Sequence, residues 1–204
     1  MTMKWLPNAV MILRCVLAIY VGYLVLEMNG DIQSDRPTGL WLFLPFALFV
    51  FTAATDWLDG VLARSMEAES RLGARLDPIA DKLLAASSLI ALSYVQNWAW
   101  YISLPAIVII GRDFLLTAMR EALGNPTTLK VSQAAKWKTA VVLTSIAAVL
   151  FGMALSYITS GVEPGSPVWI ICHAPIFLGL AGLWLAAIMS VMTAAEYVTA
   201  IGKA

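Results

Sequence analysis

Long apolar runs are the feature that most restricts the fold of this chain. Six stretches are each long enough to cross the hydrocarbon core of a bilayer as a helix, which takes about 20 residues. They cover residues 9–28, 40–64, 77–96, 98–121, 134–160 and 168–197. Segments rich in turn-forming residues, such as "NGDIQSDRPTG" and "SGVEPGSP", separate them. The sequence therefore predicts an all-α integral membrane protein, with six transmembrane helices in a single domain over residues 1–204.

The composition excludes several classes of protein. Hydrophobic residues make up 60% of the chain and charged residues only 13%, whereas soluble domains are about a quarter charged. The formal net charge is zero, so no nucleic-acid partner is expected. Cys15 and Cys172 lie in apolar runs and His173 is the lone histidine, which disfavours a disulfide framework or a zinc site.

The distribution of positive charge predicts the topology. Membrane proteins keep Lys and Arg on the cytoplasmic side. If both termini are cytoplasmic, Arg36 is the one basic residue on the opposite side. The first apolar run carries Arg14 and is followed by no small-residue cleavage site, so we expect a retained span. The cytoplasmic set is then Lys4, Arg64, Arg71, Arg75, Lys82, Arg120, Lys130, Lys136, Lys138 and Lys203.

Four aspartates stand where the second and third spans meet the predicted cytoplasmic face. Asp56 and Asp59 are three residues apart, and Asp77 and Asp81 are four apart, so each pair shares one face of a helix. Consecutive antiparallel helices allow the two faces to meet. Four carboxylates in a small space must bind cations or protons, and Mg²⁺ or Mn²⁺ prefers such oxygen ligands. The sequence predicts a site for two divalent ions, beside which Gly60 and Gly73 permit close backbone approach.

A structural interpretation competes for some of these residues. Asp77 before Pro78 resembles a helix N-cap followed by proline at the first helical position. Asp56 and Asp59 have Arg64 or Arg75 as alternative partners. Neither reading accounts for all four aspartates together, because Asp81 remains on an apolar face.

The spacing Asp56-x2-Asp59-Gly60-x2-Ala63-Arg64-x8-Gly73-x3-Asp77-x3-Asp81 resembles the signature of the CDP-alcohol phosphotransferase family. The resemblance implies a six-span, homodimeric enzyme in which an alcohol displaces CMP from a CDP-linked alcohol. "LPNAVMILR", "IIGRDFLLTAMREALG" and "VSQAAKWKTAVVL" further resemble the phosphatidylglycerophosphate synthase branch. That branch uses CDP-diacylglycerol and glycerol 3-phosphate at the cytoplasmic face of the bacterial inner membrane, surrounded by membrane lipid.

The resemblance also implies residue roles. Asp81 would be the catalytic general base, and the metal ligands would be Asp56, Asp59, Asp77 and Asp81, holding Mg²⁺ or Mn²⁺. The CDP-binding residues would be Asn8, Asp56, Asp59, Gly60, Ala63, Arg64, Gly73 and Asp77. For Arg64, a cytoplasmic anchor at a span end is the alternative.

The phosphate of the acceptor needs cations of its own. The candidates are Arg14, Arg112, Arg120, Lys136 and Lys138. Arg112 has adjacent Asp113 as an alternative partner, and each lysine has the alternative role of a positive-inside anchor. Lys136 and Lys138 are two residues apart, so both reach one phosphate only if the helix begins between or after them.

Two other functions remain open. Branch members carry Glu where this chain has Asp113, and Arg-Asp is similar to the cardiolipin synthases of the same family, whose acceptor is phosphatidylglycerol. "KWKT" favours glycerol 3-phosphate, since a phosphomonoester needs more positive charge than a diester. A divalent-cation transporter is the more distant alternative, because transport sites lie near the midplane and these carboxylates are predicted at the membrane edge.

Overall fold

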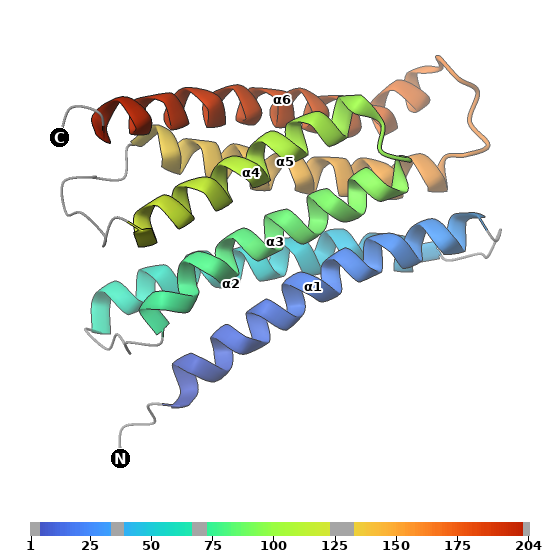
Figure 1. Ribbon diagram of the computed structural model, residues 1–204. Coiled ribbons are helices and arrows are strands. Elements are labelled where there is room, and N and C mark those ends of the chain that lie inside the picture. Colours follow the sequence, from blue (N-terminus) through green and yellow to red (C-terminus); the bar gives the residue numbers. More distant parts are fainter. Residues whose placement is uncertain (1–4, 34–38, 67–72, 123–132, 202–204) are drawn as a thin grey trace.

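The chain forms a bundle of long helices (Figure 1). The computed structural model describes the backbone of residues 5–33, 39–66, 73–122 and 133–201, and the side chains of residues 12–30, 39–55, 82–119 and 136–195. Its elements are α1 (Trp5–Gln33), the short 3₁₀ helix η1 (Gly39–Phe43), α2 (Leu44–Met66), α3 (Gly73–Val95), α4 (Trp100–Ala122), α5 (Gln133–Ile158) and α6 (Pro167–Ile201). The six α-helices coincide with the six apolar stretches, so the all-α architecture is confirmed.

The helices alternate in direction. In Figure 1, α1, α3 and α5 begin on the left, and α2, α4 and α6 end there. We call this side the charged end, because Arg14, Lys82, Arg112, Asp113 and Lys138 all lie within roughly three turns of it. The backbone positions of the four aspartates, on the later turns of α2 and the early turns of α3, lie at the same end.

The outer surface of the bundle suits a lipid environment. Within the described part of the chain, α1, α4, α5 and α6 contain segments long and apolar enough to cross a membrane, at Ile12–Gly30, Trp100–Met119, Lys136–Ile158 and Pro167–Ala195. The described apolar parts of the other two helices are shorter, at Gly39–Thr55 and Lys82–Val95. Large apolar side chains such as Ile107, Phe114 and Leu178 point outward. The protein is therefore a polytopic membrane protein, while spanning by α2 and α3 stays a prediction.

Small residues let the helices approach closely, as is common in membranes. α5 packs along α6 more extensively than any other pair of helices. A Cβ atom built on Gly179 of α6 would lie 2.7 Å from the carbonyl oxygen of Ser145 and 2.6 Å from Cγ2 of Val149. Across the bundle, Ser87 of α3 donates a hydrogen bond of 2.6 Å to the carbonyl oxygen of Ala18 on α1. These contacts fix the spacing of the helices that carry the charged residues.

Local sequence signals set helix ends on the side opposite the charged end. α3 ends in a Schellman-type turn, in which Trp98 N donates to Ser93 O at 2.7 Å and Asn97 N donates to Tyr94 O at 2.9 Å. Asn97 has a φ of 51°, a conformation that asparagine tolerates better than most residues. At the start of α6, the hydroxyl of Ser166 accepts a hydrogen bond from Trp169 N at 3.2 Å, with Pro167 at the first helical position.

Candidate functional site

The acidic residues lie on two helices that contact one another, in the segments that belong to the charged end. Asp56 and Asp59 belong to the second half of α2, and Asp77 and Asp81 belong to the first half of α3. α2 contacts α3. The side chains of all four aspartates lie outside the described residues, so their convergence on a metal stays a prediction. Among the described residues, no cluster of three His, Cys, Asp or Glu side chains is placed to hold a metal ion.

The start of α3 disagrees with the N-cap interpretation of Asp77. The helix begins at Gly73, four residues before Asp77, and Pro78 lies inside it. Asp77 is therefore on the second turn, where its side chain cannot cap the first N–H groups of the helix. The backbone removes the main structural explanation for this aspartate.

The expected CDP-binding residues are distributed over three helices. Asn8 lies on α1, Gly60, Ala63 and Arg64 lie on α2, and Gly73 is the first residue of α3. Their helical segments all belong to the charged end. Their side chains are outside the described residues, so their contacts with a nucleotide stay predictions.

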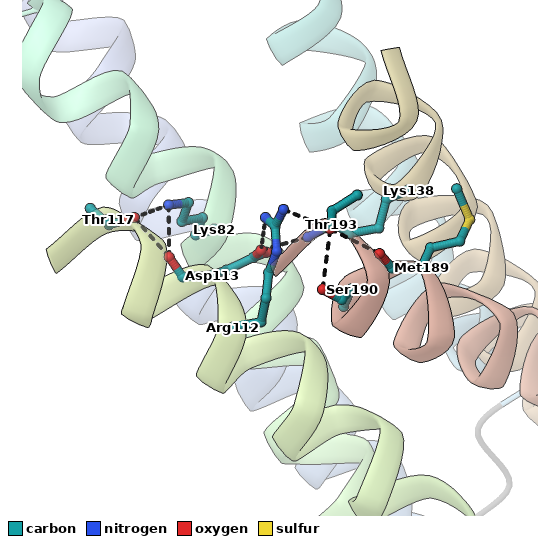
Figure 2. Close-up of polar contacts among 8 residues, drawn as sticks. All are labelled: Lys82, Arg112, Asp113, Thr117, Lys138, Met189, Ser190 and Thr193. Carbon is teal, nitrogen blue, oxygen red and sulfur yellow. Dashed lines mark hydrogen bonds and ion pairs between the residues drawn. The ribbon is translucent and has the colours of Figure 1, made fainter. Parts of the chain in front are cut away.

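A partly buried polar cluster joins α4 to α5 (Figure 2). Lys138 Nζ of α5 donates a hydrogen bond of 2.5 Å to Oδ1 of Asp113 on α4. Arg112 Nη1 donates to the same oxygen at 3.0 Å. The exposed fractions of the three side chains are 4% for Lys138, 14% for Arg112 and 19% for Asp113. Two cations thus share one carboxylate in a poorly solvated place, where removing one partner is costly.

The final helix supplies the next contact. Arg112 Nη2 donates a hydrogen bond of 2.8 Å to the hydroxyl oxygen of Thr193 on α6. That hydroxyl donates in turn to the carbonyl oxygens of Met189 at 2.8 Å and Ser190 at 3.1 Å. Figure 2 shows the guanidinium between Asp113 and Thr193. The sequence interpretation missed Thr193, although the spacing of Ser190 and Thr193 on an apolar helix was a usable signal.

A second branch connects the cluster with α3. Lys82 Nζ donates a hydrogen bond of 3.1 Å to the backbone carbonyl oxygen of Asp113 and another to the hydroxyl of Thr117. Thr117 donates to the same carbonyl oxygen at 2.8 Å. Lys82 directly follows Asp81 in the sequence. The turn of α3 that bears Asp81 is therefore tied to the turn of α4 that bears Arg112 and Asp113.

The two lysines of "KWK" occupy different environments. α5 begins at Gln133, before both residues, so the condition under which both could reach one phosphate is not met. Lys138 is buried and Lys136 is exposed. The helical period places residues two apart on nearly opposite sides. Only Lys138 enters the cluster.

For the other acceptor-site candidates, Arg14 and Arg120, the structure gives fewer side-chain contacts. Arg14 is buried on α1 at the charged end. The side chain of Arg120 lies outside the described residues, although its backbone belongs to the last turn of α4. Of the five candidate cations, the described contacts bring together Arg112 and Lys138.

His173 is far from the acidic segments, near the start of α6 and opposite the charged end. Its Nδ1 lies 2.9 Å from the carbonyl oxygen of Trp169, and its ring stacks on the indole with centroids 4.1 Å apart. Cys15 and Cys172 are free thiols. A structural role accounts for the contacts of this histidine.

Comparison with known proteins gives consistent similarities. The sequence model for CDP-alcohol phosphatidyltransferases matches residues 4–201. A protein of Cereibacter sphaeroides named CDP-diacylglycerol–glycerol-3-phosphate 3-phosphatidyltransferase is 31% identical, over 96% of this chain and 95% of the relative. A protein of the same name from Haemophilus influenzae is 37% identical, over 65% of this chain and 70% of the relative. A cardiolipin synthase (CMP-forming) from Oryza sativa subsp. japonica is 35% identical, over 66% of this chain and 46% of the relative.

Proposed function

The chain belongs to the CDP-alcohol phosphatidyltransferase family, and from this premise we propose that it transfers a phosphatidyl group from CDP-diacylglycerol to glycerol 3-phosphate, releasing CMP. The names of the relatives from Cereibacter sphaeroides and Haemophilus influenzae support this pair of substrates. The product is phosphatidylglycerophosphate.

One structural observation carries the proposal. The hydrogen bond from Lys82 to the Asp113 carbonyl oxygen ties the turn of α3 that bears Asp81 to the turn of α4 that bears the cation cluster. The acid-rich segment that we propose binds metal is therefore tied to the turn that carries Arg112, one of the two cations that we propose bind phosphate. Transfer between a pyrophosphate donor and a phosphorylated alcohol needs both kinds of group close together.

The donor set of the acidic segment fits divalent ions. Asp56 and Asp59 lie on one face of α2, Asp77 and Asp81 lie on one face of α3, and these helices contact one another. Carboxylate oxygens are the ligands that Mg²⁺ and Mn²⁺ prefer, and four of them suit two ions. When bound, such ions neutralise the charge of the pyrophosphate.

The reaction needs one proton acceptor and no covalent enzyme intermediate. Asp81 accepts the proton from the attacking hydroxyl of glycerol 3-phosphate. The hydroxyl oxygen forms a bond to the phosphorus that bears diacylglycerol, and the bond from that phosphorus to the CMP oxygen breaks. The segments bearing Asn8, Gly60, Ala63, Arg64 and Gly73 hold the CDP group.

The pair of cations formed by Arg112 and Lys138 favours an acceptor with its own phosphate. Arg112 and Lys138 together face one described carboxylate, that of Asp113. A phosphomonoester carries nearly two negative charges at neutral pH, against one for a phosphodiester, and therefore gains more from this pair. Arg14 and Arg120 are further candidates for the same phosphate.

Cardiolipin synthase is the second candidate. The adjacent pair Arg112–Asp113 and the similarity to the rice protein named cardiolipin synthase (CMP-forming) favour it. In that reaction the acceptor hydroxyl belongs to phosphatidylglycerol, and its diester phosphate would lie against the cation cluster.

We also propose the setting of the reaction. The charged end would face the cytoplasm at the inner membrane, because the positive-inside rule places the basic residues there. The working form would be a homodimer, as in the family that the sequence resembles.

A CMP-release assay tests the proposal. The purified protein in detergent is mixed with CDP-diacylglycerol, Mg²⁺ or Mn²⁺, and either glycerol 3-phosphate or phosphatidylglycerol. We expect CMP with glycerol 3-phosphate and loss of activity when a chelator removes the metal. CMP with phosphatidylglycerol alone would replace the proposed acceptor, and no CMP with any alcohol would overturn the assignment.

A further inference from the structure

The C-terminal helix holds one residue of the cation cluster in place. Thr193 of α6 is buried, and its hydroxyl oxygen accepts the hydrogen bond from Arg112 Nη2. Arg112 Nη1 is bound to Asp113. The guanidinium, which is planar, is therefore fixed at two of its nitrogens by two different helices.

Thr193 is suited to holding a cation without neutralising it. Its single hydroxyl proton is already directed to the carbonyl oxygens of Met189 and Ser190 on its own helix. The oxygen can therefore only accept from Arg112. Unlike Asp113, a hydroxyl carries no charge, so the positive charge of the guanidinium remains available to an anion.

Two buried polar groups next to this contact remain unused. Arg112 Nε and Ser190 Oγ have no hydrogen-bond partner within the described part of the chain. Ser190 lies three residues before Thr193, on the same side of α6. Buried polar atoms without partners are uncommon in proteins, and here both come from the turns that the Arg112–Thr193 bond joins.

We propose that Thr193 is a positioning residue, which orients Arg112 so that its free Nε–H and its charge face the phosphate of the acceptor. The inference rests on the proposed function for the identity of that acceptor. α6 thereby takes part in acceptor recognition, although it carries none of the residues expected from the sequence to bind substrate.

The test compares Thr193→Val, which removes the hydroxyl at nearly constant volume, with Thr193→Ser, which keeps it. In the CMP-release assay, the valine variant should raise KM for glycerol 3-phosphate about tenfold, as expected for a lost hydrogen bond to a charged group. Its KM for CDP-diacylglycerol should stay within about twofold of wild type. The serine variant should restore most of the lost affinity for the acceptor.

Thr144→Val is the matched control. Thr144 of α5 makes the same contacts within its helix, to the carbonyl oxygens of Ala140 at 2.8 Å and Val141 at 3.1 Å, and binds no described cation. Its two KM values should match those of wild type. If the valine variant loses its cooperative melting transition, Thr193→Ala replaces it in the test, and the same changes in the two KM values are expected.

A double-mutant cycle separates positioning from a general loss of stability. Arg112→Lys keeps the charge but lacks the planar fork that contacts Asp113 and Thr193 together. In the Arg112→Lys background, Thr193→Val should change the KM for the acceptor by less than about twofold, because Arg112→Lys has already removed the hydrogen bond to Thr193. Equal effects in both backgrounds, or equal increases in both KM values, would overturn the inference.

Failure of the proposed function gives a different result. If wild type releases CMP only with phosphatidylglycerol, the glycerol 3-phosphate assignment fails, and the same variants are then measured with the working acceptor. If wild type releases no CMP, binding of inorganic phosphate is measured by thermal stabilisation of the protein in detergent. Phosphate should stabilise wild type more than Thr193→Val, and equal stabilisation would overturn the role of Thr193.

Discussion

The acidic and basic parts of the charged end are assembled differently. The four aspartates fall within 26 consecutive residues on two successive helices, from Asp56 to Asp81. The cation cluster takes Arg112 and Asp113 from α4, Lys138 from α5 and Thr193 from α6, with contacts across 25 and 81 positions of sequence. A motif confined to neighbouring helices is visible as a spacing, whereas a cluster drawn from three helices becomes visible only when they pack.

This difference predicts separate kinetic effects. Changes in the acidic part should lower turnover, because its groups act on the reacting atoms. Changes in the basic part should weaken binding of the acceptor and leave the nucleotide substrate largely unaffected.

The largest expected effect is that of Asp81→Asn. Loss of the general base should lower kcat by about 10²–10⁴-fold, while the protein still binds metal and CDP-diacylglycerol. CMP release measures turnover, and calorimetric titration measures nucleotide binding. Glu163→Gln, at an exposed acid on the side opposite the charged end, is the control and should behave as wild type. A kcat near normal for Asp81→Asn would remove its role as base.

The two lysines of α5 give the next comparison. Lys138→Met should raise the acceptor KM roughly 10- to 100-fold, because it removes a buried charged hydrogen-bond donor. Lys136→Met should change it less than about twofold, because that side chain is exposed. Similar effects of the two substitutions on the acceptor KM would show that burial in the cluster does not decide which lysine acts.

Asp113→Asn tests whether the carboxylate is the counter-ion of the cluster. Without it, Arg112 and Lys138 repel one another, and the free energy of unfolding should fall by about 3 kcal/mol. Inorganic phosphate should restore more stability to this variant than to wild type, since an anion replaces the lost charge. Thermal melting in detergent measures this, with chloride at equal ionic strength as the control. A variant as stable as wild type would contradict the prediction.

The smallest effect is expected from Gly179→Ala, which tests the spacing of α5 and α6. Its Cβ would meet the Ser145 carbonyl oxygen and Val149, costing about 1–2 kcal/mol of stability. Because the substitution shifts Thr193 relative to Lys138, it should raise the KM for the acceptor a few-fold. This corresponds to a loss of about 1 kcal/mol or less in binding free energy. Gly111→Ala is the control, because no described atom beyond the neighbouring backbone of its own helix lies within 4 Å of the added Cβ. An increase in the KM for CDP-diacylglycerol alone would contradict the prediction that changes in the basic part weaken binding of the acceptor and leave the nucleotide substrate largely unaffected.

Much of the fold could be predicted because its signals are local. Apolar length and intervening turn residues located all six helices, and the structure moved their ends by only a few residues, as at Gly73 and Gln133. The function was also accessible, because the spacing from Asp56 to Asp81 resembled that of the family to which the chain belongs. In the basic part, the sequence interpretation left Arg112 with two alternatives, phosphate or Asp113, and the structure shows the second contact.

The sequence by itself determined that the chain is helical, that it is an integral membrane protein, and that it carries four carboxylates at one end of two successive helices. These properties depend on hydropathy, helical period and residue order, which are fixed before packing begins. The tertiary structure alone decided that Lys138 rather than Lys136 is buried with Asp113, and that Thr193 of the last helix holds Arg112. Such contacts depend on the rotation and spacing of helices far apart in the chain, which close packing at residues such as Gly179 fixes.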